Sequence, residues 1–182
     1  AMHFITGEKI PAEQMAMMSE ELNLYGEDRR RLNIEAGSVP EEYRVLVIGS
    51  GMSGILAAVR LKEAGILFDV VDKNPEIGGT WFLNTYPGCQ VDSANHLYNY
   101  IFAPESQWPG HFSGQSELLE YFLRVVEEFG LRDDIQLGTE VLSALWHERT
   151  AEWEVCSLDS EGNKSTNRYD SIVSACGQLN LP

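Results

Sequence analysis

The spacing of apolar residues changes several times along this 182-residue chain, and each spacing predicts a different kind of element. Between residues 11 and 35 apolar side chains recur at steps of three and four, as they do on one face of a helix. These side chains are Met15, Met18, Leu22 and Tyr25. The run Gly37-Ser38-Val39-Pro40 that follows is typical of a linker. Residues 1–42 are therefore predicted to be a helical extension and linker ahead of the main domain.

Residues 44–49 and 66–71 predict two strands, and the second is apolar apart from Asp69, as expected of a strand that is covered on both faces. The residues between these strands predict a helix that ends near Ala64, with Gly65 as its C-terminal cap. This order of strand, helix and strand predicts a βαβ unit, in which a crossover helix joins two parallel strands.

Residues 73–113 show neither helical spacing nor strand alternation, and they are rich in Gly, Pro, Asn and aromatic residues. So long an irregular stretch inside a compact domain is usually functional or disordered. The many aromatic residues argue against disorder. We therefore expect this stretch to contribute to a functional site.

The rest of the chain predicts one helix and several short strands. The helix is expected over about residues 115–129, capped by Ser113 or Ser116 and ended by Gly130. Alternating segments predict an antiparallel meander, and apolar runs predict two further strands, the last of them buried. The meander segments are 140–147, 152–158 and 165–169, and the further strands are 135–137 and 171–175.

These elements together predict an α/β fold of the Rossmann type over residues 43–182. It comprises a parallel sheet with an inserted antiparallel β-meander, preceded by the N-terminal helical extension.

The net charge of −15 excludes two classes of partner. Nucleic acids and anionic membranes both require clustered Lys and Arg, which this acidic chain does not offer. No apolar run approaches the roughly 20 residues that a membrane span needs. The four histidines, His3, His96, His111 and His147, lack the spacing of metal ligands, so no metal site is predicted. Three widely spaced cysteines are typical of reduced thiols in a cytosolic protein, so we expect a cytoplasmic location.

The strongest chemical signal is a glycine-rich turn between the first predicted strand and its helix. Gly49 allows a tight turn, Gly51 lets the backbone approach a pyrophosphate, and Gly54 allows close packing of helix and strand. Residues 49–54 carry no basic side chain, so bound phosphates would rely on backbone N–H groups and the helix dipole. The residues predicted to surround the pyrophosphate are Gly49, Ser50, Gly51, Met52, Ser53 and Gly54.

An acidic residue, Asp72, ends the second predicted strand, about 20 positions beyond the glycine motif. A carboxylate at this place can accept hydrogen bonds from two ribose hydroxyls and would repel a 2′-phosphate. The expected ligand is therefore a dinucleotide with an unmodified adenosine ribose, either FAD or NAD.

The segments that follow resemble flavoprotein monooxygenases. Asp72-Lys73-Asn74-Pro75-Glu76-Ile77-Gly78-Gly79-Thr80-Trp81 is similar to the segment after the second strand in these enzymes, and Tyr86-Pro87-Gly88-Cys89-Gln90-Val91-Asp92 to their Tyr-Pro-Gly-x-x-x-Asp stretch. The run Ala175-Cys176-Gly177 is similar to the segment that returns beside the cofactor. Together with Tyr98 and the Trp108-to-Phe112 run, these motifs resemble the FAD-binding portion of Baeyer–Villiger monooxygenases of the 4-hydroxyacetophenone monooxygenase type.

This resemblance implies a set of FAD contacts beyond the glycine loop. Asp72 with Lys73 would lie at the adenosine ribose, Val141 would contact adenine through its backbone, and Tyr98 would contact the cofactor. Gly79, Thr80 and Trp81 would approach the flavin half, and Cys176 and Gly177 would close the site. Asp92 matches the catalytic aspartate that lies near the flavin and positions an arginine.

Four positions depart from the family pattern. Asp72 stands where Glu is usual, and its shorter arm changes its reach to the ribose. Gln90 stands where Arg is usual and cannot supply a fixed positive charge for nicotinamide handling. Leu83 and Thr85 stand where the family often has Trp and Arg.

The resemblance implies an enzyme that uses FAD, NADPH and O2 to convert small ketones or aldehydes to esters. Such enzymes also need a second glycine motif for NADPH, an active-site arginine and a linker motif, none of which occurs in these residues. We therefore expect the chain to be the FAD-binding part of such an enzyme and to be inactive alone. The alternatives are a fragment of a flavin-containing or N-hydroxylating monooxygenase, or a non-catalytic dinucleotide-binding module.

Overall fold

The computed structural model describes residues 11–21, 24–26, 28, 30–31, 34–35 and 37–178. The chain divides into two compact units. The smaller unit combines residues up to 31 with Gln90–Ser113, and the sheet unit combines Leu32–Cys89 with the residues from Gly114 onward. Each unit is described by itself.

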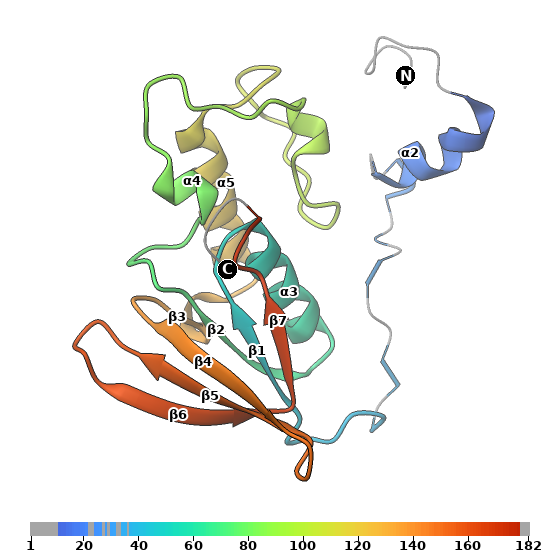
Figure 1. Ribbon diagram of the computed structural model, residues 1–182. Helices are drawn as coiled ribbons and strands as arrows, with labels where there is room; N and C mark the ends of the chain where they lie inside the picture. Colours follow the sequence, from blue (N-terminus) through green and yellow to red (C-terminus); the bar gives the residue numbers. More distant parts are fainter. Residues whose placement is uncertain are drawn as a thin grey trace. The chain divides into compact units, whose positions relative to one another are not determined.

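A four-stranded parallel sheet is the centre of the sheet unit (Figure 1). Its strands are β1 (Arg44–Ile48), β2 (Leu67–Val71), β3 (Ile135–Gln136) and β7 (Ser171–Ser174), in the order β3-β2-β1-β7. The central strands β1 and β2 lie in register, with Val47 opposite Val70. Helix α3 (Met52–Glu63) connects them, which confirms the predicted βαβ unit. Gly65 follows this helix with a φ of +68°, as expected of a C-terminal glycine.

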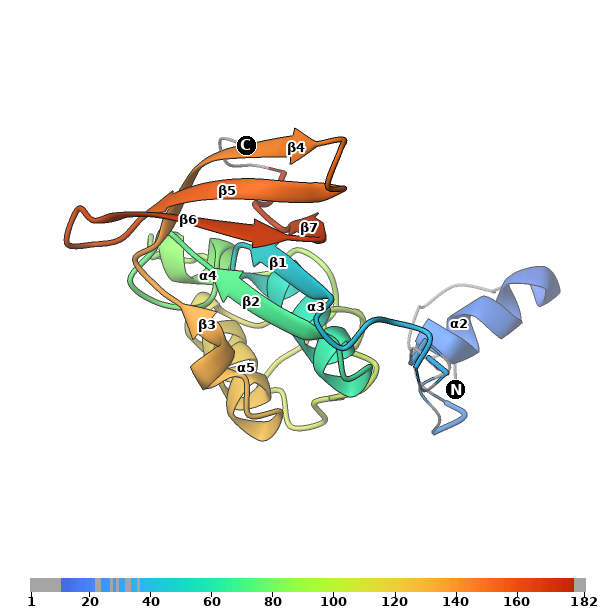
Figure 2. The ribbon, with the colours of Figure 1, turned by 90° about the horizontal axis from the view of Figure 1, so that it is seen from below.

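Three helices complete the sheet unit together with a second sheet. Helices α3 and α5 (Gln115–Glu128) lie on one side of the parallel sheet, and the short helix α4 (Thr80–Leu83) contacts α5. The predicted meander is confirmed as an antiparallel sheet of β4 (Glu140–His147), β5 (Glu152–Leu158) and β6 (Lys164–Tyr169). Figure 2 shows this second sheet on the opposite side of the parallel sheet from α3 and α5. The parallel sheet is therefore the middle layer of the unit.

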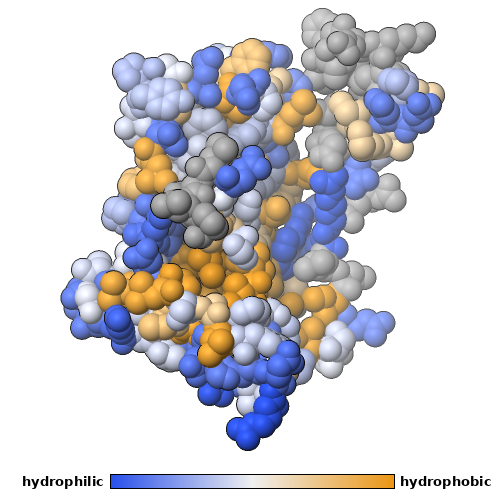
Figure 3. All heavy atoms as spheres, viewed as in Figure 1, coloured by the Kyte–Doolittle hydropathy of each residue, from blue (hydrophilic) through white to orange (hydrophobic). Residues whose placement is uncertain are grey.

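The space between the two sheets is filled by a hydrophobic core. Leu46 and Val71 from the parallel sheet meet Val155 and Tyr169 from the antiparallel sheet, and all four are almost fully buried. Large apolar side chains also remain exposed on the strands, among them Leu142, Leu145 and Val173. Figure 3 shows apolar surface gathered over the middle of one face of the molecule.

Two expectations about this unit are wrong in detail. Strand β7 was expected to be buried, but Val173 and Ser174 are exposed because β7 has β1 as its one neighbour among the described strands. Helix α5 is capped at Gly114, not at Ser113 or Ser116. The Gly114 N–H donates to Oε2 of Glu117 at 2.7 Å, so the Glu side chain at the third helical position binds the N–H of the capping residue, as in one half of a capping box.

The smaller unit contains helix α2 (Met15–Glu21) with one 3₁₀ turn directly before it, and the 90–113 segment with a second 3₁₀ turn. The 3₁₀ turns are η1 (Ala12–Gln14) and η2 (Asn95–Leu97). Of the predicted apolar stripe, Met15 and Tyr25 are exposed and Leu22 lies outside the described residues. Asn95 holds the segment together, because its side chain donates to Gly110 O at 2.8 Å and accepts from Ser113 N–H at 2.7 Å.

Candidate dinucleotide-binding site

The glycine motif forms the turn between β1 and α3, and its first glycine is required by the backbone. Gly49 has a φ of +106°, and its N–H donates to Val71 O at 2.7 Å. A Cβ at this residue would lie 2.6 Å from the carbonyl oxygen of Ala175, which follows β7. Both the left-handed conformation and this close approach exclude a side chain. The turn therefore lies against the carboxyl end of β7.

The other two glycines of the motif have different neighbours. A Cβ at Gly54 would lie 1.8 Å from the carbonyl oxygen of Gly49, so the first turn of α3 packs directly on the loop before it. A Cβ at Gly51 would lie 3.4 Å from the Cα of Gly79, which is an ordinary contact. Gly54 is thus required for packing within the chain, whereas Gly51 tolerates a Cβ as far as the chain's own atoms are concerned.

A second glycine pair, Gly78 and Gly79, packs on the first motif through the backbone. Both residues have positive φ, and the Gly78 N–H donates to Ser50 O at 3.2 Å. A Cβ at Gly79 would lie 2.8 Å from the Cα of Gly51. Two segments that are distant in sequence therefore form one assembly of backbone groups at the carboxyl end of the parallel sheet, which is where ligands bind in open α/β sheets.

Helix α4 begins directly after this pair and carries two further predicted residues. Thr80 is exposed, while Trp81 is 7% exposed and its carbonyl oxygen accepts a hydrogen bond from Nε2 of Gln115 on α5. The indole of Trp81 is therefore part of the core in this structure, next to the glycine pair in sequence.

Asp72 lies at the end of β2 and is only 6% exposed. Its Oδ2 accepts hydrogen bonds from the Ser50 N–H and the Ser50 hydroxyl, both at 2.7 Å. Its Oδ1 accepts from the backbone N–H of Asn74 at 2.8 Å and from Nδ2 of Asn74 at 2.9 Å. The carboxylate that was expected to face a ribose is thus fully engaged by groups of the chain itself.

The main chain around Asp72 is fixed as well. The Asp72 N–H donates to Gln136 O at 3.0 Å, and the Thr139 N–H donates to Asp72 O at 2.8 Å. These bonds attach the end of β2 to the segment between β3 and β4. Val141 begins the irregular part of β4, where the register shifts between Val141 and Ser143, and its side chain is half-buried in the core between the sheets.

The segment after β7 runs beside the start of the glycine loop. The Ala175 N–H donates to Ile48 O at 2.8 Å, and Sγ of Cys176 lies 3.9 Å from the same oxygen. Gly177 follows with a φ of +81°. Residues 175–177 therefore lie next to the glycine turn, as the sequence motif implies.

The predicted residues fall into two groups. The structure brings together the glycine loop, Asp72, Gly79 and Cys176 in the sheet unit. Lys73 follows Asp72 and is exposed. Asp92, which is exposed, and Tyr98, which is half-buried, belong to the smaller unit. Their roles at a cofactor stay predictions.

The residue that sequence reasoning did not single out is Asn74, which supplies two of the four hydrogen bonds to Asp72. The signal was the Asp-x-Asn spacing, since an Asp side chain often accepts from the N–H two residues later in an Asx turn.

Burial, and then the nearby His111, lowers the pKa of His96 in the smaller unit. The two imidazole rings lie 5.9 Å apart.

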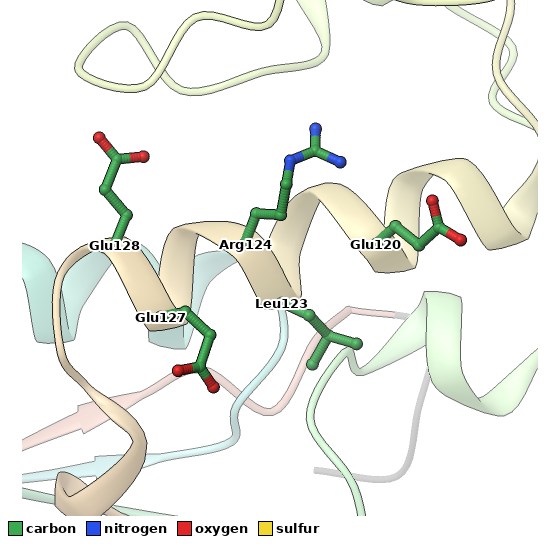
Figure 4. A pocket seen from close by; sticks show the side chains of 5 residues that line it. All are labelled: Glu120, Leu123, Arg124, Glu127 and Glu128. Atoms are coloured by element: carbon green, nitrogen blue, oxygen red, sulfur yellow. The ribbon is translucent and has the colours of Figure 1, made fainter.

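Other features of the described residues do not add a site. No group of three or more His, Cys, Asp or Glu among them is arranged to hold a metal ion. No helix in the described part of the chain is long and apolar enough to cross a membrane. A shallow depression lies on α5, lined by Glu120, Leu123, Arg124, Glu127 and Glu128. Figure 4 shows these side chains pointing to opposite sides of a single helix, so they do not converge on a ligand.

The parallel sheet, the glycine turn at its carboxyl end and the acidic end of β2 define a dinucleotide-binding domain of the Rossmann type. The family of NAD(P)-binding Rossmann-like domains matches residues 47–107, which include the turn and the second glycine pair.

Known relatives of the chain are monooxygenases. A Baeyer–Villiger monooxygenase from Streptomyces coelicolor is 42% identical over 149 residues, which are 81% of this chain and 28% of that protein. The open crystal structure of cyclohexanone monooxygenase superposes with a TM-score of 0.67 and 36% identity, covering 77% of this chain and 29% of the other. The crystal structure of OTEMO in complex with FAD and NADP superposes with a TM-score of 0.68 and 29% identity. This match covers 76% of this chain and 26% of the OTEMO chain.

Over the length that it covers, the chain is a homologue of Baeyer–Villiger and other FAD-binding monooxygenases, which confirms the resemblance expected from its motifs. The chain spans about a quarter of the length of the curated relatives that it matches.

Proposed function

We propose that this chain is the FAD-binding part of a flavin-dependent monooxygenase that converts small ketones or aldehydes to esters with NADPH and O2. The observation that carries the proposal is the backbone assembly of Gly49–Gly54 with Gly78 and Gly79. Glycine in both segments leaves main-chain groups uncovered by side chains, which is what close approach of a pyrophosphate requires.

The residues present fit FAD at this place. The first intrahelical hydrogen bond of α3 runs from Ile55 N–H to Gly51 O at 3.0 Å, so the N–H groups of Ser53 and Gly54 precede it. Such groups at a helix N-terminus, with the helix dipole behind them, bind phosphate without a basic side chain. We call the space in which the pyrophosphate would lie, against Gly49–Gly54 and the Gly78-Gly79 pair, the cradle. A Cβ at Gly51 would occupy this space. Bound FAD would supply the redox chemistry, and this chain would bind and orient it.

Other residues have proposed roles that rest on the family resemblance. Val141 and Lys73 would lie at the adenosine end, and Thr80, Trp81 and Cys176-Gly177 nearer the flavin. Asp92 would act close to the flavin, and Tyr98 would contact the cofactor. The names of relatives support a small-molecule substrate, since they include an acetone monooxygenase from a Gordonia strain and an ε-caprolactone-bound cyclohexanone monooxygenase. We propose a cytoplasmic location on the grounds of the three free cysteines, and no nucleic-acid or membrane partner on the grounds of the acidic composition.

The second candidate is a domain that binds NAD(P) alone, which the matching domain family supports by its description. The second glycine pair favours FAD over this alternative. Its backbone packs on Gly51 and extends the cradle beyond the single glycine turn that a nicotinamide dinucleotide needs.

The two candidates are separated by titrating the purified chain into FAD and following the quenching of flavin fluorescence. We expect saturable quenching that excess NAD⁺ does not reverse. Reversal by NAD⁺, or binding of NAD⁺ without FAD, would support the second candidate instead.

A parallel incubation tests whether the chain is active alone. With FAD, NADPH, O2 and 4-hydroxyacetophenone present, we expect no ester by chromatography. Ester formation would show that the chain is catalytically sufficient and would contradict this part of the proposal.

A further inference from the structure

Helix α5 packs on the second glycine pair through the side chain of Leu119. A Cβ at Gly78 would lie 2.5 Å from Cδ1 of Leu119, so this methyl group contacts the backbone of Gly78 directly. Phe82 of α4 closes a second side, because its Cβ would lie 3.2 Å from the same added atom. Gly78 is buried and has a φ of +131°, which residues with a side chain rarely adopt. Glycine is therefore required at position 78 by its packing on α5 as well as by its conformation.

Helix α5 is itself fixed in the core of the sheet unit. Leu118 and Phe122, which flank the contact in sequence, are fully buried. Gln115 lies four residues before Leu119 and so on the same side of the helix, and its side chain donates to Trp81 O on α4. Figure 1 shows α4 beside α5. One side of α5 therefore contacts both the second glycine pair and the helix that follows it.

Gly79 connects this contact to the glycine turn. A Cβ at Gly79 would lie 2.8 Å from Cα of Gly51, so the two backbones are in direct contact. The N–H groups of Phe82 and Leu83 donate to Gly79 O at 3.2 and 3.0 Å, which ties Gly79 to α4. The position of Gly79 against Gly51 is thus set by the turn on one side and by α4 and α5 on the other. A shift of Gly78 toward α5 would separate Gly79 from Gly51.

We propose that Leu119 is a positioning residue, which holds Gly78 from the side of α5 and thereby keeps Gly79 against Gly51 in the arrangement that forms the cradle. Leu119 acts through Gly78, which is buried, and its role needs no contact with the cofactor. A glycine pair held in place in advance binds a ligand without the entropic cost of being ordered. The effect on FAD rests on the proposed function, whereas the effect on Gly78 is a property of the chain without ligand.

The packing is tested first without ligand, by NMR. In the unmodified chain we expect a nuclear Overhauser effect between a methyl group of Leu119 and the Hα protons of Gly78. Leu119→Ala removes this methyl group and leaves a cavity, so the Gly78 amide, which donates to Ser50 O, should exchange about fivefold faster or more. Leu119→Met has a similar volume and should restore this exchange to within about twofold of the unmodified chain. Leu119→Val is a smaller truncation, and it takes the place of Leu119→Ala if that variant does not fold.

Leu61→Ala is the matched control. Leu61 is a half-buried leucine in the last turn of α3, so the same substitution removes a similar side chain in the same unit. At 1.5 Å per residue it lies roughly 15 Å along the helix from Gly51. This variant should lose stability in urea unfolding and leave the exchange of Gly78 as in the unmodified chain. Absence of the Overhauser effect, unchanged exchange of Gly78 in Leu119→Ala, or an equal acceleration in the control would overturn the positioning role.

The second arm measures FAD affinity by quenching of flavin fluorescence, at a temperature at which each variant is folded. We expect Leu119→Ala to weaken binding about fivefold or more, and Leu119→Met to bind within about twofold of the unmodified chain. Leu61→Ala should bind FAD unchanged. Rescue by methionine and no loss in the control are results that a general loss of stability would not give. Unchanged affinity in a folded Leu119→Ala, or an equal loss in Leu61→Ala, would overturn the effect on FAD.

If the unmodified chain does not bind FAD, the proposed function fails, and the exchange of Gly78 still decides whether Leu119 positions the second glycine pair. The two failures are therefore distinguishable.

Discussion

Alanine substitutions at Gly51 and Gly54 should separate the binding role of the glycine motif from its structural role. The two residues lie three positions apart, yet a Cβ would meet Gly79 Cα at 3.4 Å in the first case and Gly49 O at 1.8 Å in the second. Gly51 has a φ of −78°, which alanine adopts without strain. The same small change is therefore tolerated by the fold at one position and excluded at the other.

The expected losses of stability follow from these distances. In Gly54→Ala the start of α3 must move away from the loop by about 1.6 Å to restore an ordinary 3.4 Å contact, and the obstacle is backbone. Overpacking of this kind costs about 1–3 kcal/mol or more, and the better helix propensity of alanine returns only about 1 kcal/mol. Because the obstacle is backbone at 1.8 Å, the upper end of this range applies, about 3 kcal/mol, and the expected net loss is about 2 kcal/mol. Gly51→Ala changes the N-cap of α3, which costs roughly 0.5–1 kcal/mol.

The substitution at Gly51, which costs the fold little, is expected to weaken FAD binding. A methyl group at Gly51 would occupy the cradle and exclude the pyrophosphate, so Gly51→Ala should weaken FAD binding at least tenfold, or about 1.4 kcal/mol. Gly65→Ala is the control, because Gly65 has a φ of +68° and no atom within 4 Å of its added Cβ. It should lose about 1 kcal/mol of stability through backbone strain and bind FAD unchanged.

Urea unfolding followed by circular dichroism measures stability, and quenching of flavin fluorescence measures affinity at 25 °C. A Gly54→Ala variant as stable as Gly51→Ala would contradict the steric role of Gly54. A folded Gly51→Ala variant that binds FAD like the unmodified chain would show that Gly51 does not line the pyrophosphate site.

Substitutions at three further positions test local features of the sheet unit. Burial, and then the charge of Asp69, raises the pKa of Tyr169 to about 12 from an ordinary value of 10.0. The stability that this contributes is full below pH 10 and is lost as the pH rises through 12, since the unfolded chain ionises first; Tyr169→Phe should flatten this fall in urea unfolding between pH 9 and 12. Ala151→Gly should raise the free energy of unfolding by roughly 0.5–1 kcal/mol, because Ala151 has a φ of +54°; a decrease would contradict this. Glu117→Ala should lower stability by about 1 kcal/mol through loss of the cap on Gly114, with Glu117→Gln losing less in the same assay.

Much of the sheet unit was predictable because its elements are specified locally. Strands β1 and β2 are mainly apolar, the helix between them is followed by a glycine, and β5 alternates apolar and polar residues over most of its length. The exposure of β7 was not predictable from its apolar run. Such a run indicates a strand, but it does not indicate whether that strand lies in the middle or at the edge of the sheet. The cap of α5 was missed for a related reason: Gly114 has no side chain to signal a cap, and the acceptor is the carboxylate of Glu117 three residues later.

The candidate site shows the same limit at finer scale. The sequence motif predicts a tight turn at Gly49, close approach of a pyrophosphate at Gly51 and close packing at Gly54, but it does not name the atoms that each glycine meets. In the structure Gly49 faces Ala175 O, Gly54 faces Gly49 O, and only Gly51 has room for a Cβ among the chain's own atoms.

An acidic residue at the end of the second strand is likewise consistent with two roles, since ribose hydroxyls and the Ser50 donors are both suitable partners for a carboxylate. The partner of the carboxylate depends on the length of its side chain and on where the turn places the Ser50 N–H. Ser50 and Asp72 are 22 residues apart in sequence, so a local motif does not fix this contact. A motif therefore predicts that a dinucleotide binds at this loop, while the three-dimensional contacts decide which residues bind it and which hold the loop in place.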